Sequence, residues 1–158
     1  MQRRFIVSDP EKCTGCGICE LVCSAVKEGA FNPLLSRIRT VRVEPYGVIN
    51  MAIACRLCED PKCVRSCPKK ALRADEETGV IIVDEDRCDG CSWCVQACEF
   101  GAMILHMDNK KPVACDLCGL DPKCVYYCPK EALALMTTEE IGQKLRRRAV
   151  KKLLAEAL

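Results

Sequence analysis

The sequence predicts an α+β protein of two related halves, whose short helices and small antiparallel sheets are held together by cysteines more than by an apolar core. Three observations lead to this prediction. The chain has 158 residues, of which 16 are cysteine and only 4% are aromatic. Cysteine at about one residue in ten marks a disulfide- or metal-stabilised scaffold. The cysteines form four groups of four, and the second half of the chain repeats the first.

The surroundings of the cysteines decide between disulfides and metal ligands. No apolar segment of the kind found in secretory signals precedes Cys13. No stretch approaches the roughly 18 apolar residues of a membrane span. We therefore expect a cytoplasmic protein that does not span a membrane. In such a reducing compartment, dense cysteine indicates metal binding.

The spacing of the cysteines indicates iron–sulfur clusters. Two quartets follow the pattern Cys-x2-Cys-x2-Cys-x3-Cys. The other two have four or five residues between the second and third cysteines and end in Cys-Pro. Three thiolates in a tight loop suit one 4Fe-4S cubane, whereas the fourth cysteine reaches a neighbouring cluster. Zinc is the alternative, but it uses two separated Cys-x2-Cys knuckles. We predict four 4Fe-4S clusters, with ligands from Cys13, Cys16, Cys19, Cys23; Cys55, Cys58, Cys63, Cys67; Cys88, Cys91, Cys94, Cys98; and Cys115, Cys118, Cys124, Cys128.

An internal repeat defines the organisation of the chain. CRLCEDPKCVRSCPKKAL from Cys55 returns as CDLCGLDPKCVYYCPKEAL from Cys115, so tight and open quartets alternate. Between the two middle quartets, a Gly-centred turn and a strand over 80–83 are similar to the connector of a bacterial two-cluster ferredoxin. We therefore expect a double ferredoxin-like domain over 1–136, made of two pseudo-symmetric modules. The inner module covers about 52–100, and the outer one about 5–51 with 101–136.

The pairing of quartets sets the expected ligands of each cluster. If the two middle quartets form one module, the first and last form the other. The fourth cysteine of each quartet then binds the cluster held by the other quartet of its module. The sets are then Cys55, Cys58, Cys63 with Cys98; Cys88, Cys91, Cys94 with Cys67; Cys13, Cys16, Cys19 with Cys128; and Cys115, Cys118, Cys124 with Cys23. Sequential pairing of the quartets within each half is the competing assignment, and the sequence leaves it open.

Two segments lie outside the cluster motifs. Residues 37–53 indicate two strands about a turn at 45–47, which either covers a cluster or docks a partner. A capping box of Thr137 and Glu140 opens an amphipathic helix over 137–158, with six basic and three acidic residues, for packing or partner docking. Nucleic-acid binding is disfavoured, because the basic residues are not interleaved with aromatic ones.

Two single residues also carry expectations. Trp93 lies inside the third quartet, and we expect it to shield a cluster from water. His106 is the only histidine, and we expect it to be packed or at the surface rather than a metal ligand.

The order of the four quartets resembles that of the four-cluster iron–sulfur subunits of molybdenum and tungsten pterin oxidoreductases, hydrogenases, and formate or carbon monoxide dehydrogenases. The resemblance covers residues 7–136. The segment CSAVKEGAFNPLLSRIRTVRV and the short length are similar to the small subunits of tungsten aldehyde oxidoreductases and of carbon monoxide dehydrogenase. The family's wiring implies the crossed ligand sets given above. Ser24 and Glu99 depart from the family, in which proline often follows the fourth cysteine.

The resemblance implies an electron-transfer subunit rather than an enzyme, and no catalytic triad or nucleotide-binding motif is present. It would conduct single electrons between a catalytic subunit, in the first place a tungsten or molybdenum pterin aldehyde oxidoreductase of anaerobic metabolism, and an acceptor such as a flavin subunit or soluble ferredoxin. We therefore expect the chain to be part of a hetero-oligomer. The alternatives are a subunit of a carbon monoxide dehydrogenase, formate dehydrogenase or hydrogenase complex, a free polyferredoxin, and a zinc-binding interaction module.

Overall fold

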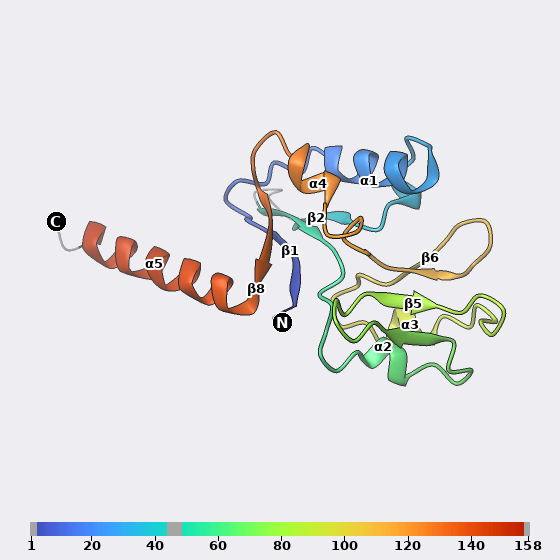
Figure 1. The fold of residues 1–158 in the computed structure, drawn as a ribbon. Helices are drawn as coiled ribbons and strands as arrows, with labels where there is room; N and C mark the ends of the chain where they lie inside the picture. The colour runs from blue at the N-terminus through green and yellow to red at the C-terminus, as the bar shows by residue number, and fades with distance from the viewer. Residues whose placement is uncertain (1–2, 44–48, 157–158) are drawn as a thin grey trace.

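The computed structural model describes residues 3–43 and 49–156 (Figure 1). Over these residues the chain forms four two-stranded antiparallel sheets with helices between them, which confirms the expected combination of small sheets and short helices. The elements in chain order are β1 (Arg4–Ser8), α1 (Ile18–Glu28), the 3-10 turn η1 (Pro33–Leu35), β2 (Arg39–Val43), β3 (Ile49–Ile53), α2 (Lys62–Arg65), β4 (Leu72–Ala74), β5 (Ile81–Val83), α3 (Trp93–Gln96), β6 (Ile104–Leu105), β7 (Pro112–Val113), α4 (Lys123–Tyr126), β8 (Leu133–Thr137) and α5 (Thr138–Glu156).

The first and last strands lie side by side. β1 pairs with β8 in antiparallel register, from Arg4 opposite Thr137 to Ser8 opposite Leu133. The Asp9 amide extends this ladder by donating to the Ala132 carbonyl at 2.7 Å. Helices α1 and α4 also contact each other in the same part of the molecule (Figure 1). Segments more than 100 residues apart in sequence therefore form one packed unit.

The middle of the chain forms a second packed unit. β4 pairs with β5, with Leu72 opposite Val83, and the short helices α2 and α3 contact each other. Met103 and Ala114 pack with Leu72 and Ile81 in one buried cluster. Two residues that the sequence analysis assigned to the outer module therefore pack against the inner strands.

The apolar core is small, as the composition indicated. One buried cluster gathers β1, β3 and β8 around Ile38, Leu57 and Leu117, each about 1% exposed. Leu57 and Leu117 occupy equivalent places in the internal repeat, and both have positive φ, at 49° and 58°. Several cysteines belong to the same clusters. The cysteine loops are therefore part of the core rather than attachments to it.

The predicted pair of strands over 37–53 is present as β2 and β3, with Val41 opposite Met51 and Val43 opposite Ile49. The turn predicted at 45–47 lies outside the described residues. All four of these apolar side chains are exposed. Because residues paired across two strands share one face of a sheet, they form an apolar surface patch, called here the hairpin patch.

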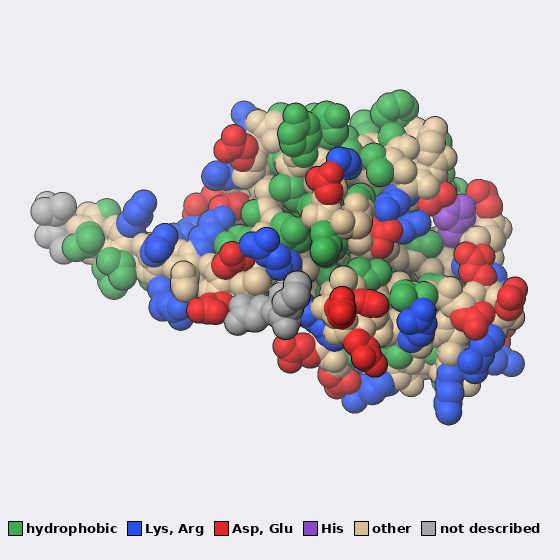
Figure 2. Space-filling model, viewed as in Figure 1, with side chains coloured by type: hydrophobic (Ala, Val, Ile, Leu, Met, Phe, Trp, Pro, Cys, Tyr) green, Lys and Arg blue, Asp and Glu red, His purple; other side chains and the backbone are tan. Residues whose placement is uncertain are grey.

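Helix α5 begins with the predicted capping box. The Thr137 hydroxyl accepts the Glu140 amide at 3.2 Å, and the Glu140 carboxylate accepts the Thr137 amide at 2.8 Å. Ile141 packs against the core, but Leu145 and Leu153 are more than half exposed. The helix leaves the body, with Lys and Arg side chains along it (Figures 1 and 2).

Among the residues described, we found no helix with the length and apolar character that crossing a membrane requires.

Replacing Thr137 with alanine removes one of the two capping-box bonds. Loss of such a cap costs about 1 kcal/mol, so we expect the Glu140 amide hydrogen to exchange about fivefold faster. Hydrogen exchange followed by NMR or mass spectrometry measures this. Thr138→Ala is the control, because its exposed hydroxyl lies outside the capping box. Equal exchange in the two variants would contradict the assigned cap.

Candidate metal centres

Three cavities are each lined by four cysteines, three from one quartet and one from another. They enclose about 340, 320 and 290 Å³ of space between protein atoms, part of it open to solvent. We call them site 1, site 2 and site 4. Their cysteines are Cys13, Cys16, Cys19 and Cys128 for site 1; Cys115, Cys118, Cys124 and Cys23 for site 2; and Cys88, Cys91, Cys94 and Cys67 for site 4.

The remaining four cysteines, Cys55, Cys58, Cys63 and Cys98, also lie near one another, and we call them site 3. Burial raises the pKa of the Cys63 thiol to about 11, and the charges of Cys55, Cys98 and Cys58 raise it further. The influence of Cys98 on Cys63 means that a cysteine of the third quartet reaches the loop of the second. In all four groupings, the fourth cysteine of one quartet lies with the first three of another.

Short helices carry each fourth cysteine to a different site from the other three. In every quartet, the third and fourth cysteines are separated by four positions, and α1, α2, α3 or α4 lies between or around them. One helical turn advances the chain by about 5.4 Å. The fourth thiol is therefore displaced by one turn from the loop that holds its own quartet, and it faces the next site.

The loops that hold the first three cysteines need backbone conformations that most residues avoid. Gly15 and Gly90 lie between cysteines of the tight quartets, with φ of 68° and 74°. In the open quartet Leu57 takes the same left-handed region, at a cost of roughly 1–2 kcal/mol for a residue with a side chain. At Gly15, a Cβ atom would lie 2.7 Å from Asn50 Oδ1. A side chain at this position would therefore displace the Asn50 side chain.

Backbone amides donate to the sulfur of every fourth cysteine. Three of these bonds come from an alanine four residues later, which donates to Cys67, Cys98 or Cys128 at 3.3 to 3.4 Å. At Cys23 the donor is the Arg37 amide, at 3.3 Å. Hydrogen bonds to sulfur stabilise the thiolate form and tune a cluster bound to it.

Cations contact the main chain of three of the four loops. Arg3 donates to the Cys58 carbonyl at 2.7 Å, and Arg42 donates to the Gly15 carbonyl at 3.1 Å. Lys111 donates to the Cys88 carbonyl in the loop of site 4. These contacts place positive charge beside sites 3, 1 and 4 respectively.

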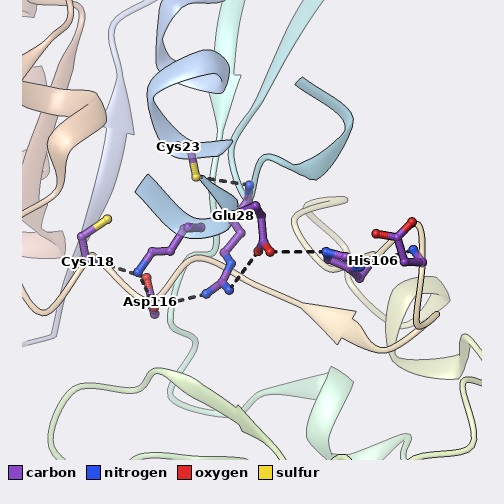
Figure 3. Close-up of polar contacts among 8 residues, drawn as sticks. Cys23, Glu28, His106, Asp116 and Cys118 are labelled. Atoms are coloured by element: carbon purple, nitrogen blue, oxygen red, sulfur yellow. Dashed lines mark hydrogen bonds and ion pairs between the residues drawn. The ribbon is translucent and has the colours of Figure 1, made fainter. Parts of the chain in front are cut away.

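At site 2 the cations contact a carboxylate instead (Figure 3). Asp116 Oδ2 accepts from Lys27 at 2.7 Å and from Arg37 at 3.2 Å, while its Oδ1 accepts the Cys118 amide at 3.1 Å. Arg37 also pairs with Glu28 at 3.6 Å, and Glu28 lies 3.5 Å from His106. Two cations and two carboxylates thus surround this site. Sequence reasoning missed this network, because its members are up to 89 positions apart.

The thiols of these sites are poorly placed to remain as free groups. Burial raises the pKa of Cys115 to about 12 and that of Cys94 to about 11. An isolated thiolate would be costly in such surroundings. Iron binding favours the deprotonated form and releases the protons. Four convergent thiols lining a cavity therefore fit a 4Fe-4S cluster, which would supply one-electron chemistry when bound.

Two expectations about single residues had different outcomes. The prediction that Trp93 shields a cluster is wrong, because its side chain is 57% exposed. Trp93 and Cys94 are adjacent on α3, where successive side chains point about 100° apart, so Trp93 faces solvent when Cys94 faces the cavity. His106 is largely buried and contacts Glu28, as expected for a packed histidine.

These sites define a ferredoxin-type iron–sulfur protein, and the chain belongs to the 4Fe-4S dicluster domain family, whose model matches residues 48–138. Residues 5–31 match a second model, a 4Fe-4S binding domain. The chain is 40% identical to an aliphatic sulfonate oxidoreductase polyferredoxin-like subunit of Pyrococcus furiosus, over 86% of this chain and 79% of that one. It is 38% identical to the putative electron transport protein YsaA of Escherichia coli, over 93% and 99%.

Other similar proteins belong to larger assemblies. The chain is 38% identical to subunit beta of the NADH-dependent phenylglyoxylate dehydrogenase of Aromatoleum evansii, over 86% of this chain and 31% of that longer subunit. Among solved structures, it is similar to a chain of the active site complex BamBC of benzoyl coenzyme A reductase. The TM-score is 0.52 at 25% identity, with 99% of this chain and 97% of that one covered.

Replacing Gly15 with alanine should destabilise the loop of site 1. The added Cβ would lie 2.7 Å from Asn50 Oδ1, and the backbone at this position has φ of +68°, which residues with a side chain rarely adopt. Gly101→Ala is the matched control, because Gly101 has φ of +61° but nothing within 4 Å of an added Cβ. We expect faster bleaching of visible absorbance by an iron chelator in Gly15→Ala than in Gly101→Ala. Equal rates would show that the loop tolerates a side chain.

Proposed function

We propose that the chain binds four 4Fe-4S clusters and conducts single electrons as a non-catalytic subunit of an oxidoreductase complex. The observation that carries this proposal is the convergence of four cysteines, three from one loop and one from another, on each of three cavities. The fourth group, around Cys63, has the same composition. The family match and the relatives named as electron transport proteins support it.

All sixteen cysteines are assigned as ligands, in the four sets that define sites 1 to 4. Sites 3 and 4 form the inner module and sites 1 and 2 the outer one, within a double ferredoxin-like domain over 1–136. The pairing of β1 with β8 supports this arrangement, because it brings the first and last quartets together. The positive φ shared by Leu57 and Leu117 supports the related shape of the two open loops.

Zinc is disfavoured by the spacing of the cysteines in the sequence, because all four quartets end in Cys-x3-Cys and do not form two separated Cys-x2-Cys knuckles. Four thiolates around one zinc ion at about 2.3 Å would lie within about 4 Å of one another. Over residues 3–43 and 49–156, no group of three or more His, Cys, Asp or Glu side chains is arranged to hold a single metal ion. A cubane keeps its thiolates further apart, since each binds a different iron.

The four sites follow one another in a line. In each neighbouring pair of sites, one thiol lies close enough to another to raise its pKa, which burial raises most. These electrostatic influences support the order site 1, site 2, site 3, site 4. The pairs are Cys19 with Cys124, Cys55 with Cys115, and Cys63 with Cys94.

The two ends of this line reach the surface. Of the sixteen cysteines, two are exposed, Cys16 in site 1 and Cys91 in site 4. Electrons can therefore enter at one terminal site and leave at the other. Sites 2 and 3 connect them through the interior.

The catalytic partner we propose is a tungsten or molybdenum pterin aldehyde oxidoreductase, with a flavin subunit or soluble ferredoxin as acceptor. The resemblance of the quartets and of the segment after Cys23 to such small subunits supports it. A carbon monoxide dehydrogenase, formate dehydrogenase or hydrogenase complex is the alternative. A free polyferredoxin is less well supported, because the hairpin patch and the outer part of α5 expose apolar side chains that a partner would cover.

Iron and labile sulfide analysis tests the clusters and their pairing together. Four cubanes predict about 16 irons per chain. In the double variant Cys58→Ser/Cys98→Ser, crossed pairing removes both ligands from one cluster, so about 12 irons remain. The matched variant Cys23→Ser/Cys58→Ser affects two clusters and leaves about 8. Sequential pairing predicts the reverse, and zinc without iron would refute the proposal.

Native purification tests the partner. We expect a catalytic subunit containing tungsten or molybdenum to co-purify with the chain, and the complex to reduce viologen with aldehydes. A complex without either metal would refute the pterin partner. A lone small species would favour the free polyferredoxin.

Charge placed on the hairpin patch tests its role in docking. Val41→Asp/Met51→Asp should weaken co-purification of the catalytic subunit about tenfold or more, because it buries two unpaired carboxylates. Met107→Asp is the control, since Met107, at 44% exposed, is similar to Val41 at 40% and Met51 at 37% but lies outside the hairpin patch. If both variants co-purify equally, the patch is not the interface. Iron content verifies that each variant is loaded.

A further inference from the structure

The two open quartets differ by charge at one equivalent position. In the internal repeat, Cys-Arg-Leu-Cys from Cys55 aligns with Cys-Asp-Leu-Cys from Cys115, so Arg56 corresponds to Asp116. The following leucines, Leu57 and Leu117, are both about 1% exposed and both have positive φ. The loops therefore have the same local shape with opposite charges at the second position, one beside site 3 and one beside site 2.

At site 3 two cations contact neutral groups, although Glu59 and Glu99 directly follow the site 3 cysteines Cys58 and Cys98, and Glu99 pairs with Lys62. The Arg56 guanidinium lies 4.2 Å from the ring centroid of Phe5 and 5.4 Å from that of Phe100. Phe5 is only 5% exposed, so the stack holds the cation over a fixed part of the core. Arg3 adds a second cation by its bond to the Cys58 carbonyl. The outer side of Arg56 faces solvent, which weakens its field without removing it.

At site 2 the nearby charges cancel. Asp116 and Glu28 together balance Lys27 and Arg37 (Figure 3). Asp116 directly follows the cluster ligand Cys115 and accepts the amide of Cys118. It thus places a fixed negative charge inside the loop, at the position where site 3 has a positive one.

Reduction adds an electron to a cluster, and nearby positive charge favours the added electron. We propose that the cluster of site 3 has a higher reduction potential than the cluster of site 2, and that Arg56 and Asp116 are the positioning residues that set the difference. This inference rests on the cluster assignment proposed above. An added electron would then favour site 3 over site 2.

An EPR-monitored redox titration of the cluster-loaded full chain tests this proposal. Arg56→Gln should lower the potential of one cluster, and Arg56→Lys, which keeps the charge, should leave it near its original value. Arg146→Gln on α5 makes the same change in net charge away from the sites, so it controls for overall charge. Cys58→Ser marks the signal of site 3, because it changes a ligand of that cluster only.

Asp116→Asn tests the other half of the proposal. The amide oxygen can still accept the Cys118 amide, but Lys27 loses its carboxylate partner and Arg37 keeps only Glu28, so the potential of a second cluster should rise. Asp108→Asn, in an exposed turn, is the control. In the double variant Arg56→Gln/Asp116→Asn, the two shifts together should narrow the difference between the reduction potentials of sites 3 and 2.

Three results would overturn the inference. The first is a shift in reduction potential no larger than in the control variants. The second is that both substitutions shift the potential of the same cluster. The third is a lower reduction potential for site 3 than for site 2 in the unsubstituted protein. The iron content of each variant distinguishes these three results from failure of the cluster assignment. A fully loaded protein without the expected shifts refutes only the inference, whereas a protein that binds no iron refutes both.

Discussion

The fold and the proposed clusters depend on one constraint: each site gathers three cysteines from one loop and the fourth from another. The fourth cysteine of a quartet follows the third by one helical turn, about 5.4 Å along the axis, and it lies beside the loop of a different quartet. The partner of the first quartet is the last, which requires the two ends of the chain to meet. The β1–β8 ladder and the contact of α1 with α4 are the consequences of that requirement.

The same constraint explains how so small an apolar core suffices. Buried leucines and isoleucines form two modest clusters, and both include cysteines. Burial raises the pKa of thiols such as Cys63 and Cys94, so free thiolates are disfavoured there, and the loops contain strained residues such as Leu57. Cluster binding would supply the missing cohesion, since metal affinity for a preformed set of ligands becomes folding free energy. Folding and cofactor loading are therefore one process in this account.

Local patterns in the sequence predicted the local structure well. The capping box of Thr137 and Glu140 and the strands on either side of residues 45–47 are governed by neighbouring residues, and both are present. Side-chain directions and long-range contacts were harder to predict from the sequence. Trp93 was expected to shield a cluster but is 57% exposed, because the sequence does not fix which face of a four-residue helix lies against the cavity. The Asp116 network joins α1, the segment after η1 and the loop of site 2, and no local signal connects these segments. The ends of the line of sites could not be predicted either, since exposure of Cys16 and Cys91 depends on the packing of the whole chain.

Crossed ligation also underlies the proposed function, because sharing cysteines between quartets brings two sites together within each module. The most direct measurement is a crystal structure of the cluster-loaded chain with an anomalous difference map at the iron edge. We predict four strong peaks in the order of sites 1 to 4, with Cys98 bound at the cluster of Cys55, Cys58 and Cys63. A cluster bound by all four cysteines of a single quartet, or fewer than four peaks, would contradict it.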